Sequence, residues 1–130
     1  MCIRDRNNID FFAYSPLSFG ILCIDPDKED NKEKSFIRNS LFENYKKPTY
    51  ELRRCLKRIA YQRSVSQAQV AINWCCYQGT IPLVGMRKKS QVIDVSNVFN
   101  WNLKKSEFKV LQELSKKCLK KMPKNPFSSI

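Results

Sequence analysis

The stretch IDFFAYSP, at residues 9–16, decides the fold class. It is a short, nearly continuous run of apolar and aromatic residues, and Ser15-Pro16 ends it. A run without polar alternation is typical of a strand that is buried on both faces, as in a parallel sheet. We therefore expect a buried strand from Ile9 to Tyr14.

Helical patterns and a second short strand follow this segment. Ser66 is a good helix N-cap, and Gly79 stands where a left-handed residue commonly ends a helix. Apolar residues recur at three- and four-residue intervals, which puts them on single helix faces. Pro82 removes one ladder donor, so the second strand should be short. The expected helices span residues 48–63, 66–78, 90–97 and 105–119, and the expected second strand spans residues 80–85. This order is typical of an α/β fold with a parallel sheet.

The composition limits the classes of partner. The chain has 130 residues, 24 Lys plus Arg against 12 Asp plus Glu, a net charge of +12 and no histidine. An excess of this size suits an anionic partner such as a phosphate-bearing cofactor, nucleic acid or a membrane surface. The basic residues are spread along the chain rather than gathered in a dense footprint, so we expect no nucleic-acid partner. No apolar stretch approaches the length of a membrane-spanning helix.

The six cysteines do not indicate a disulfide framework. Cys55, Cys75 and Cys118 fall on apolar faces of the expected helices, where free cysteine acts as a small hydrophobe. There is no C-x-x-C pair, no histidine and no secretory signal, so neither a metal site nor an oxidising compartment is expected. We expect a reducing, cytoplasmic setting.

Several motifs, taken in order, resemble the C-terminal portion of the aldo-keto reductase family. Residues 13–22, AYSPLSFGIL, resemble the segment that ends strand seven of that family, and residues 66–74, SQAQVAINW, resemble its helix seven. Residues 81–87, IPLVGMR, are similar to its strand-eight segment, and Gln91 and Asp94 fall where it places a Q-x-x-E pair. The resemblance implies the last two βα units and the C-terminal helix of a (β/α)₈ TIM barrel.

The same resemblance implies a site for NADP(H) near strands seven and eight, where such barrels bind phosphate. Tyr14 would lie against the nicotinamide, and Ser15 and Leu17 would meet the pyrophosphate. Arg87 would bind the 2′-phosphate, and Asp94 would face the adenine amino group, although Val95 replaces the asparagine usual next to that acid. The nine implied cofactor residues are Tyr14, Ser15, Leu17, Gly20, Gly85, Met86, Arg87, Gln91 and Asp94. Arg38 is a further candidate. Without a cofactor, Tyr14 would be a core tyrosine, Ser15-Pro16 a turn and Arg87 a surface arginine.

The resemblance also implies that this chain holds no catalytic residue. In that family the tyrosine that acts as general acid, and the lysine, aspartate and histidine that support it, come from the first half of the barrel. A complete barrel needs about 250 residues. We expect an artefactual or disordered leader at residues 1–7, the partial barrel at 8–121 and a tail at 122–130. The full-length protein would reduce a small carbonyl substrate. The alternatives are a nucleotide-binding or regulatory remnant without turnover and, on charge alone, a basic nucleic-acid-binding module.

Overall fold

Two short parallel strands and a set of helices form the structure, a computed structural model that describes residues 6–28 and 43–119. The expected tail at 122–130, most of the expected leader and Arg38 lie outside these residues. In chain order the elements are β1 (Phe12–Tyr14), the 3₁₀ helix η1 (Ser18–Cys23), α3 (Tyr50–Arg63), α4 (Gln67–Tyr77), β2 (Ile81–Leu83), α5 (Lys89–Ser96), the 3₁₀ helix η2 (Asn97–Asn100) and α6 (Lys105–Leu119).

The helix α4 begins and ends where its capping residues predict. The Ser66 side chain accepts a hydrogen bond from the backbone N–H of Gln69 at 3.1 Å, which satisfies a donor that the helix leaves free. Gly79, just after the helix, has φ +69°, the left-handed conformation that glycine adopts without a steric cost. Both expectations for this helix are confirmed, and those for α3, α5 and α6 hold to within about two residues.

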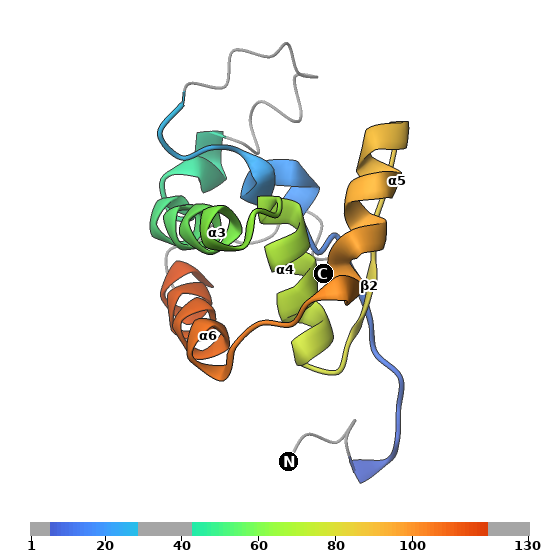
Figure 1. Cartoon of the computed structure of the whole chain (residues 1–130). Coiled ribbons are helices and arrows are strands. Elements are labelled where there is room, and N and C mark those ends of the chain that lie inside the picture. The colour runs from blue at the N-terminus through green and yellow to red at the C-terminus, as the bar shows by residue number, and fades with distance from the viewer. Residues whose placement is uncertain (1–5, 29–42, 120–130) are drawn as a thin grey trace.

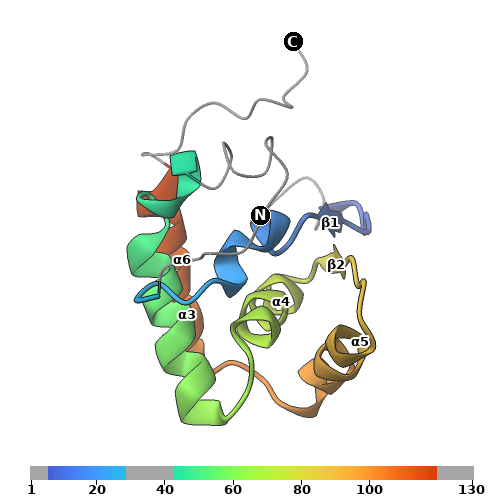
Figure 2. The ribbon, with the colours of Figure 1, turned by 90° about the horizontal axis from the view of Figure 1, so that it is seen from above.

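The core lies between three helices. α3 and α6 pack side by side, and α4 lies between this pair and the two strands (Figures 1 and 2). The apolar faces that the sequence predicts meet there, and Cys55, Cys75 and Cys118 are buried, as expected. The central cluster comprises Cys55, Leu56, Ile59, Ala60, Val70, Ala71, Leu103 and Leu111.

A buried amide holds the connection from α5 to α6 against α4. The Asn73 side chain donates to the carbonyl oxygens of Val98 at 3.2 Å and Trp101 at 2.8 Å, and it accepts from the N–H of Leu103 at 3.1 Å. Asn73 is only 5% exposed, so these bonds replace the water that its amide loses on burial. The segment 97–103 is thereby fixed across α4.

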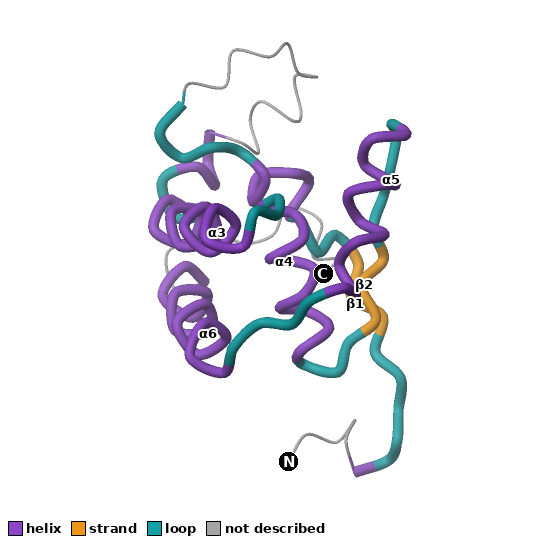
Figure 3. The backbone as a smooth tube through the Cα atoms, in the orientation of Figure 1, coloured by secondary structure: helices purple, strands orange, loops and turns teal. Residues whose placement is uncertain are grey.

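The strands are parallel, as expected, but they are not buried on both faces. β1 pairs with β2 in the register Phe12 with Ile81, Ala13 with Pro82 and Tyr14 with Leu83, and the two strands lie side by side (Figure 3). The helices α4 and α5 contact each other on one side of the strands (Figure 2). Phe11 and Phe12 are 54% and 56% exposed, so the predicted burial of this segment is wrong. The reason is that the sheet among the described residues has two strands, and each strand has one neighbour. The expected strands at 9–14 and 80–85 shorten to three residues each.

Candidate functional site

A pocket of about 260 Å³ opens beyond the carboxyl ends of both strands. Leu17 and Cys23 reach it from the segment after β1, and Val84 to Met86 reach it from the segment after β2. The first turn of α4 and one face of α5 complete the wall. The lining residues are Leu17, Cys23, Ser66, Gln67, Ala68, Val84, Gly85, Met86, Gln91, Asp94 and Val95. Ligands of open and closed parallel sheets bind at this end of the strands.

Five of the nine cofactor residues implied by the resemblance line this pocket, namely Leu17, Gly85, Met86, Gln91 and Asp94. The other four lie in its neighbourhood in the chain but not on its wall. Tyr14 ends β1 with 74% of its surface exposed, and Ser15 follows it with φ +52°. Gly20, within η1, has φ +91°. Arg87 is exposed in the segment between β2 and α5, two residues before that helix begins.

Asp94 accepts two side-chain hydrogen bonds at the wall of the pocket. The hydroxyl of Ser66 donates to its Oδ2 at 2.6 Å, and the amide Nε2 of Gln69 donates to its Oδ1 at 2.7 Å. Both donors come from the start of α4, so the carboxylate fastens α5 to that helix. An ionised carboxylate has about four lone-pair sites, and these bonds take one on each oxygen. Asp94 thus keeps acceptor capacity within the pocket.

Gln91 organises the turn between β2 and α5. Its Oε1 accepts from the backbone N–H groups of Arg87 at 2.8 Å and Lys88 at 3.0 Å. An adenosine contact by this side chain would therefore fall to its amide nitrogen. Arg87, Lys88 and Lys89 are all exposed at the start of α5, where three positive charges and the helix dipole together favour an anion.

Cys23 adds a thiol to the wall that the sequence did not indicate. Desolvation of this thiol and, second, the nearby carboxylate of Asp94 raise its pKa to about 11. The residue as a whole is nevertheless exposed. At neutral pH the side chain is therefore a protonated thiol, a weak donor and acceptor rather than a nucleophile.

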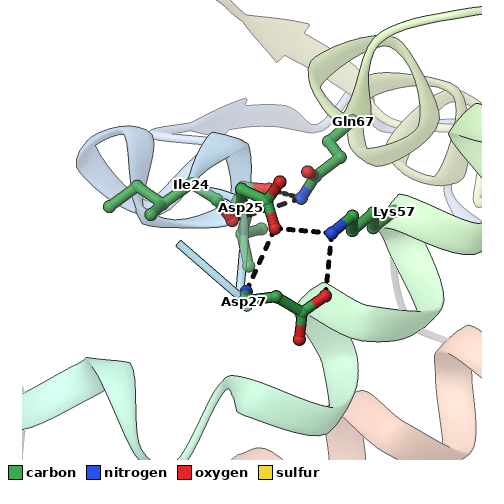
Figure 4. Close-up of polar contacts among 6 residues, drawn as sticks. Ile24, Asp25, Asp27, Lys57 and Gln67 are labelled. Carbon is green, nitrogen blue, oxygen red and sulfur yellow. Dashed lines mark hydrogen bonds and ion pairs between the residues drawn. The ribbon is translucent and has the colours of Figure 1, made fainter. Parts of the chain in front are cut away.

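A polar network holds the segment that carries Cys23 against the helices (Figure 4). Lys57, on α3, lies 2.7 Å from Oδ1 of Asp25 and 2.7 Å from Oδ2 of Asp27. The hydrogen bond from Lys57 lowers the pKa of Asp25, and the same bond raises the pKa of Lys57. Gln67, on α4, donates to the carbonyl oxygens of Leu22 at 3.1 Å and Ile24 at 3.4 Å. The segment is thus tied to two helices at once.

Six residues of the pocket wall were not expected from the sequence, namely Cys23, Ser66, Gln67, Ala68, Val84 and Val95. Ser66 was recognised as a helix cap, and Val84 lies within the expected second strand. What was missing was the packing of α4 beside α5, which brings the first turn of α4 to the pocket. No feature of the sequence pattern signals Cys23.

Within residues 6–28 and 43–119, no group of three or more His, Cys, Asp or Glu side chains is placed to hold a metal ion. None of the described helices is both long and apolar enough to cross a membrane.

Comparisons with known proteins agree on one family. The model of the "Aldo/keto reductase family" matches residues 1–116. A chloroplastic pyridoxal reductase of Arabidopsis thaliana is 32% identical over 127 residues, which is 98% of this chain and 34% of the relative. A putative aryl-alcohol dehydrogenase of Saccharomyces cerevisiae is 24% identical over 83% of this chain and 32% of its own length. The chain therefore spans about a third of the length of these curated relatives.

One solved structure supports the fold. The glycerol dehydrogenase AKR11B4 of Gluconobacter oxydans matches with a TM-score of 0.68 and 24% identity, over 98% of this chain and 40% of that protein. At this identity the likeness concerns the fold alone.

Proposed function

The chain belongs to the aldo/keto reductase family, and from this premise we propose that it forms the NADP(H)-binding C-terminal part of a (β/α)₈-barrel oxidoreductase. The complete protein would reduce aldehydes or ketones to alcohols. The names of its relatives, a pyridoxal reductase and a putative aryl-alcohol dehydrogenase, agree with a carbonyl–alcohol interconversion. A reducing compartment such as the cytoplasm is in keeping with the free cysteines among the described residues.

The observation that carries the proposal is the pocket beyond β1 and β2. Its volume, about 260 Å³, is below the roughly 300–1,000 Å³ of pockets that enclose a whole drug-sized ligand. It therefore suits one end of a dinucleotide rather than all of it. Leu17, Val84 and Val95 give it apolar walls, and Asp94 provides a hydrogen-bond acceptor. Apolar walls with one acceptor fit a flat heteroaromatic ring that carries an amino group, as adenine does.

The remaining candidates surround this adenine pocket. We assign Arg87 to the 2′-phosphate because a planar guanidinium can donate two hydrogen bonds to phosphate oxygens at once. The neighbouring Lys88 and Lys89 add two positive charges at this position. Ser15 and Leu17 lie in a tight turn after β1, in which the N–H of Ser18 bonds the carbonyl of Ser15 at 2.9 Å, and Gly20 follows within η1. This turn is assigned to the pyrophosphate. The exposed ring of Tyr14 is assigned to the nicotinamide face.

The chain's part in the reaction is binding and orientation. NADPH, when bound, supplies the hydride that reduces the carbonyl carbon. Tyr14 would hold the nicotinamide ring in place, and Arg87 and Asp94 would fix the far end of the molecule. The proton for the carbonyl oxygen has to come from a general acid, which we assign to the part of the protein upstream of this chain.

Calorimetric titration of the purified chain with NADPH and, separately, with NADH tests the proposal. We expect NADPH to bind more tightly, and Arg87→Ala to weaken NADPH about tenfold while leaving NADH nearly unchanged. Arg54→Ala is the matched control, because Arg54 is an exposed arginine on α3 outside the pocket. No binding of NADPH, or equal losses in both variants, would contradict the cofactor assignment. Reduction of a simple aldehyde by this chain alone would contradict the assignment of the catalytic residues.

A further inference from the structure

Gln69 lies behind the pocket and does not line it. It is only 5% exposed, yet both ends of its amide are bonded. Its Nε2 donates to Oδ1 of Asp94 at 2.7 Å, and its Oε1 accepts from the indole Nε1 of Trp101 at 3.0 Å. A buried polar side chain with both ends satisfied has one defined orientation.

The direction of the Gln69 amide is set by its partners. The indole N–H of Trp101 can only donate, so it must meet the oxygen of the amide. The carboxylate of Asp94 can only accept when ionised, so it must meet the nitrogen. Trp101 is itself held in place, because the guanidinium of Arg63 lies 5.0 Å from the centre of its ring. A chain of contacts from Arg63 through Trp101 and Gln69 therefore ends at Asp94.

We propose that Gln69 is a positioning residue, which holds the Asp94 carboxylate so that its remaining lone pairs meet the amino group of adenine. The proposal rests on the function proposed above. Ser66 fixes Oδ2 and Gln69 fixes Oδ1, so the plane of the carboxylate is set from two sides. Loss of Gln69 leaves Asp94 held through one oxygen, free to turn about its side-chain bonds.

The test uses the hypoxanthine analogue of NADPH, in which a carbonyl oxygen replaces the adenine amino group. Affinities for NADPH and for this analogue are measured on the full chain by calorimetry. The unaltered chain is expected to prefer NADPH about tenfold, because a hydrogen bond to a charged acceptor is lost with the analogue. In Gln69→Met the ratio of the two affinities is expected to fall toward one. A merely structural residue would weaken both ligands and leave the ratio unchanged.

Two further variants give a second test of the Gln69 contact and a control. Trp101→Phe leaves Gln69 in place but removes the partner that holds its Oε1, which frees the amide to turn away from Asp94. The ratio should therefore fall here as well, even if Gln69→Met does not fold. Thr49→Val is the control, because Thr49 is a buried polar residue whose hydroxyl donates to the carbonyl of Tyr45 at 2.6 Å and which lies outside the contacts that lead to Asp94. Near-ultraviolet circular dichroism at the assay temperature checks that each variant is folded.

The outcomes separate the two proposals. A ratio that falls in Gln69→Met and Trp101→Phe but not in Thr49→Val supports the positioning role. A ratio that stays at the unaltered value in folded Gln69→Met overturns it and leaves the cofactor site standing. An unaltered chain that binds NADPH without preferring it to the analogue overturns the assignment of Asp94 to adenine. A chain that does not bind NADPH overturns the proposed function itself.

Discussion

Arg63 and Glu107 form a bidentate ion pair that joins the end of α3 to the start of α6. Nε of Arg63 donates to Oε1 of Glu107 at 3.2 Å, and Nη2 donates to Oε2 at 2.7 Å. The same Oε2 accepts from the backbone N–H of Lys104 at 2.7 Å. The two side chains are 20% and 16% exposed, so solvent screens the pair less than it screens a pair on the open surface. One carboxylate thus links two helices and the connection before α6.

This ion pair predicts a loss of stability in acid. Burial alone would raise the pKa of Glu107, but the hydrogen bonds from Arg63 and from the N–H of Lys104 outweigh it and lower the pKa. A lowered carboxylate pKa stabilises the fold above the ordinary value of 4.5, and this contribution is lost as the pH falls below 4.5 through the folded-state pKa. Glu107→Gln should cost about 1 kcal/mol at neutral pH and flatten the acid limb of a plot of Tm against pH.

Glu113→Gln is the control for this prediction. Glu113 lies on the same helix, but it is 64% exposed, and among the described residues it pairs with Lys116 one turn away, at 3.3 Å. Its removal should change the free energy of unfolding by at most a few tenths of a kcal/mol. Similar acid limbs in both variants would show that the Arg63 pair is not the cause.

Two positions with positive φ predict opposite effects of substitution. Ser64, which follows α3, has φ +53°, where a side chain costs about 1–2 kcal/mol relative to the right-handed region. Ser64→Gly should therefore stabilise the fold by up to about 1 kcal/mol. Gly79, with φ +69°, has open space where a Cβ would stand, so Gly79→Ala should destabilise through the backbone alone, by about 1 kcal/mol. Urea unfolding of both variants checks the two signs, and shifts of the same sign would contradict the argument.

The helices could be predicted from the sequence because their signals are local. The Ser66 side chain caps α4 by bonding the N–H of Gln69, three residues further along the chain. Gly79 follows the end of the helix in a left-handed backbone conformation. The burial of β1 could not be predicted, because burial is a property of the neighbours of a strand. Phe11 and Phe12 have the composition of a buried strand, and in this structure about half of each is exposed.

The candidate site was partly predictable for the same reason. Leu17, Gly85 and Asp94 follow or adjoin recognisable motifs, so the resemblance selected them. Ser66 and Gln69 belong to the site through Asp94, 28 and 25 residues away in the chain. The proximity of Ser66 and Gln69 to Asp94 depends on how α4 and α5 pack against each other. The spacing of apolar residues along each helix does not determine that packing.

Cys23 predicts a direct report of ligand binding. Its pKa of about 11 leaves little thiolate at neutral pH, so alkylation by iodoacetamide should be slow and should accelerate as the pH rises toward that value. Because Cys23 lines the pocket, NADPH should slow its labelling at alkaline pH. Cys76, on α4 and outside the pocket, is the internal control, and its labelling should not depend on NADPH. Mass spectrometry of tryptic peptides resolves the two sites, and equal protection of both would indicate a general tightening of the fold instead.

The exposed side chains of the sheet predict self-association. Phe12 and Ile81 are register partners on β1 and β2, with 56% and 43% of their surfaces exposed. Exposed apolar groups beside unpaired strand edges are a template for contact between copies, and a lysine on such a strand commonly prevents it. Phe12→Lys should therefore reduce light scattering at high protein concentration, while the free energy of unfolding changes by no more than about 0.5 kcal/mol. Phe99→Lys adds the same charge on η2, where Phe99 is 81% exposed and outside the sheet. If it reduces scattering equally, net charge rather than the sheet governs association.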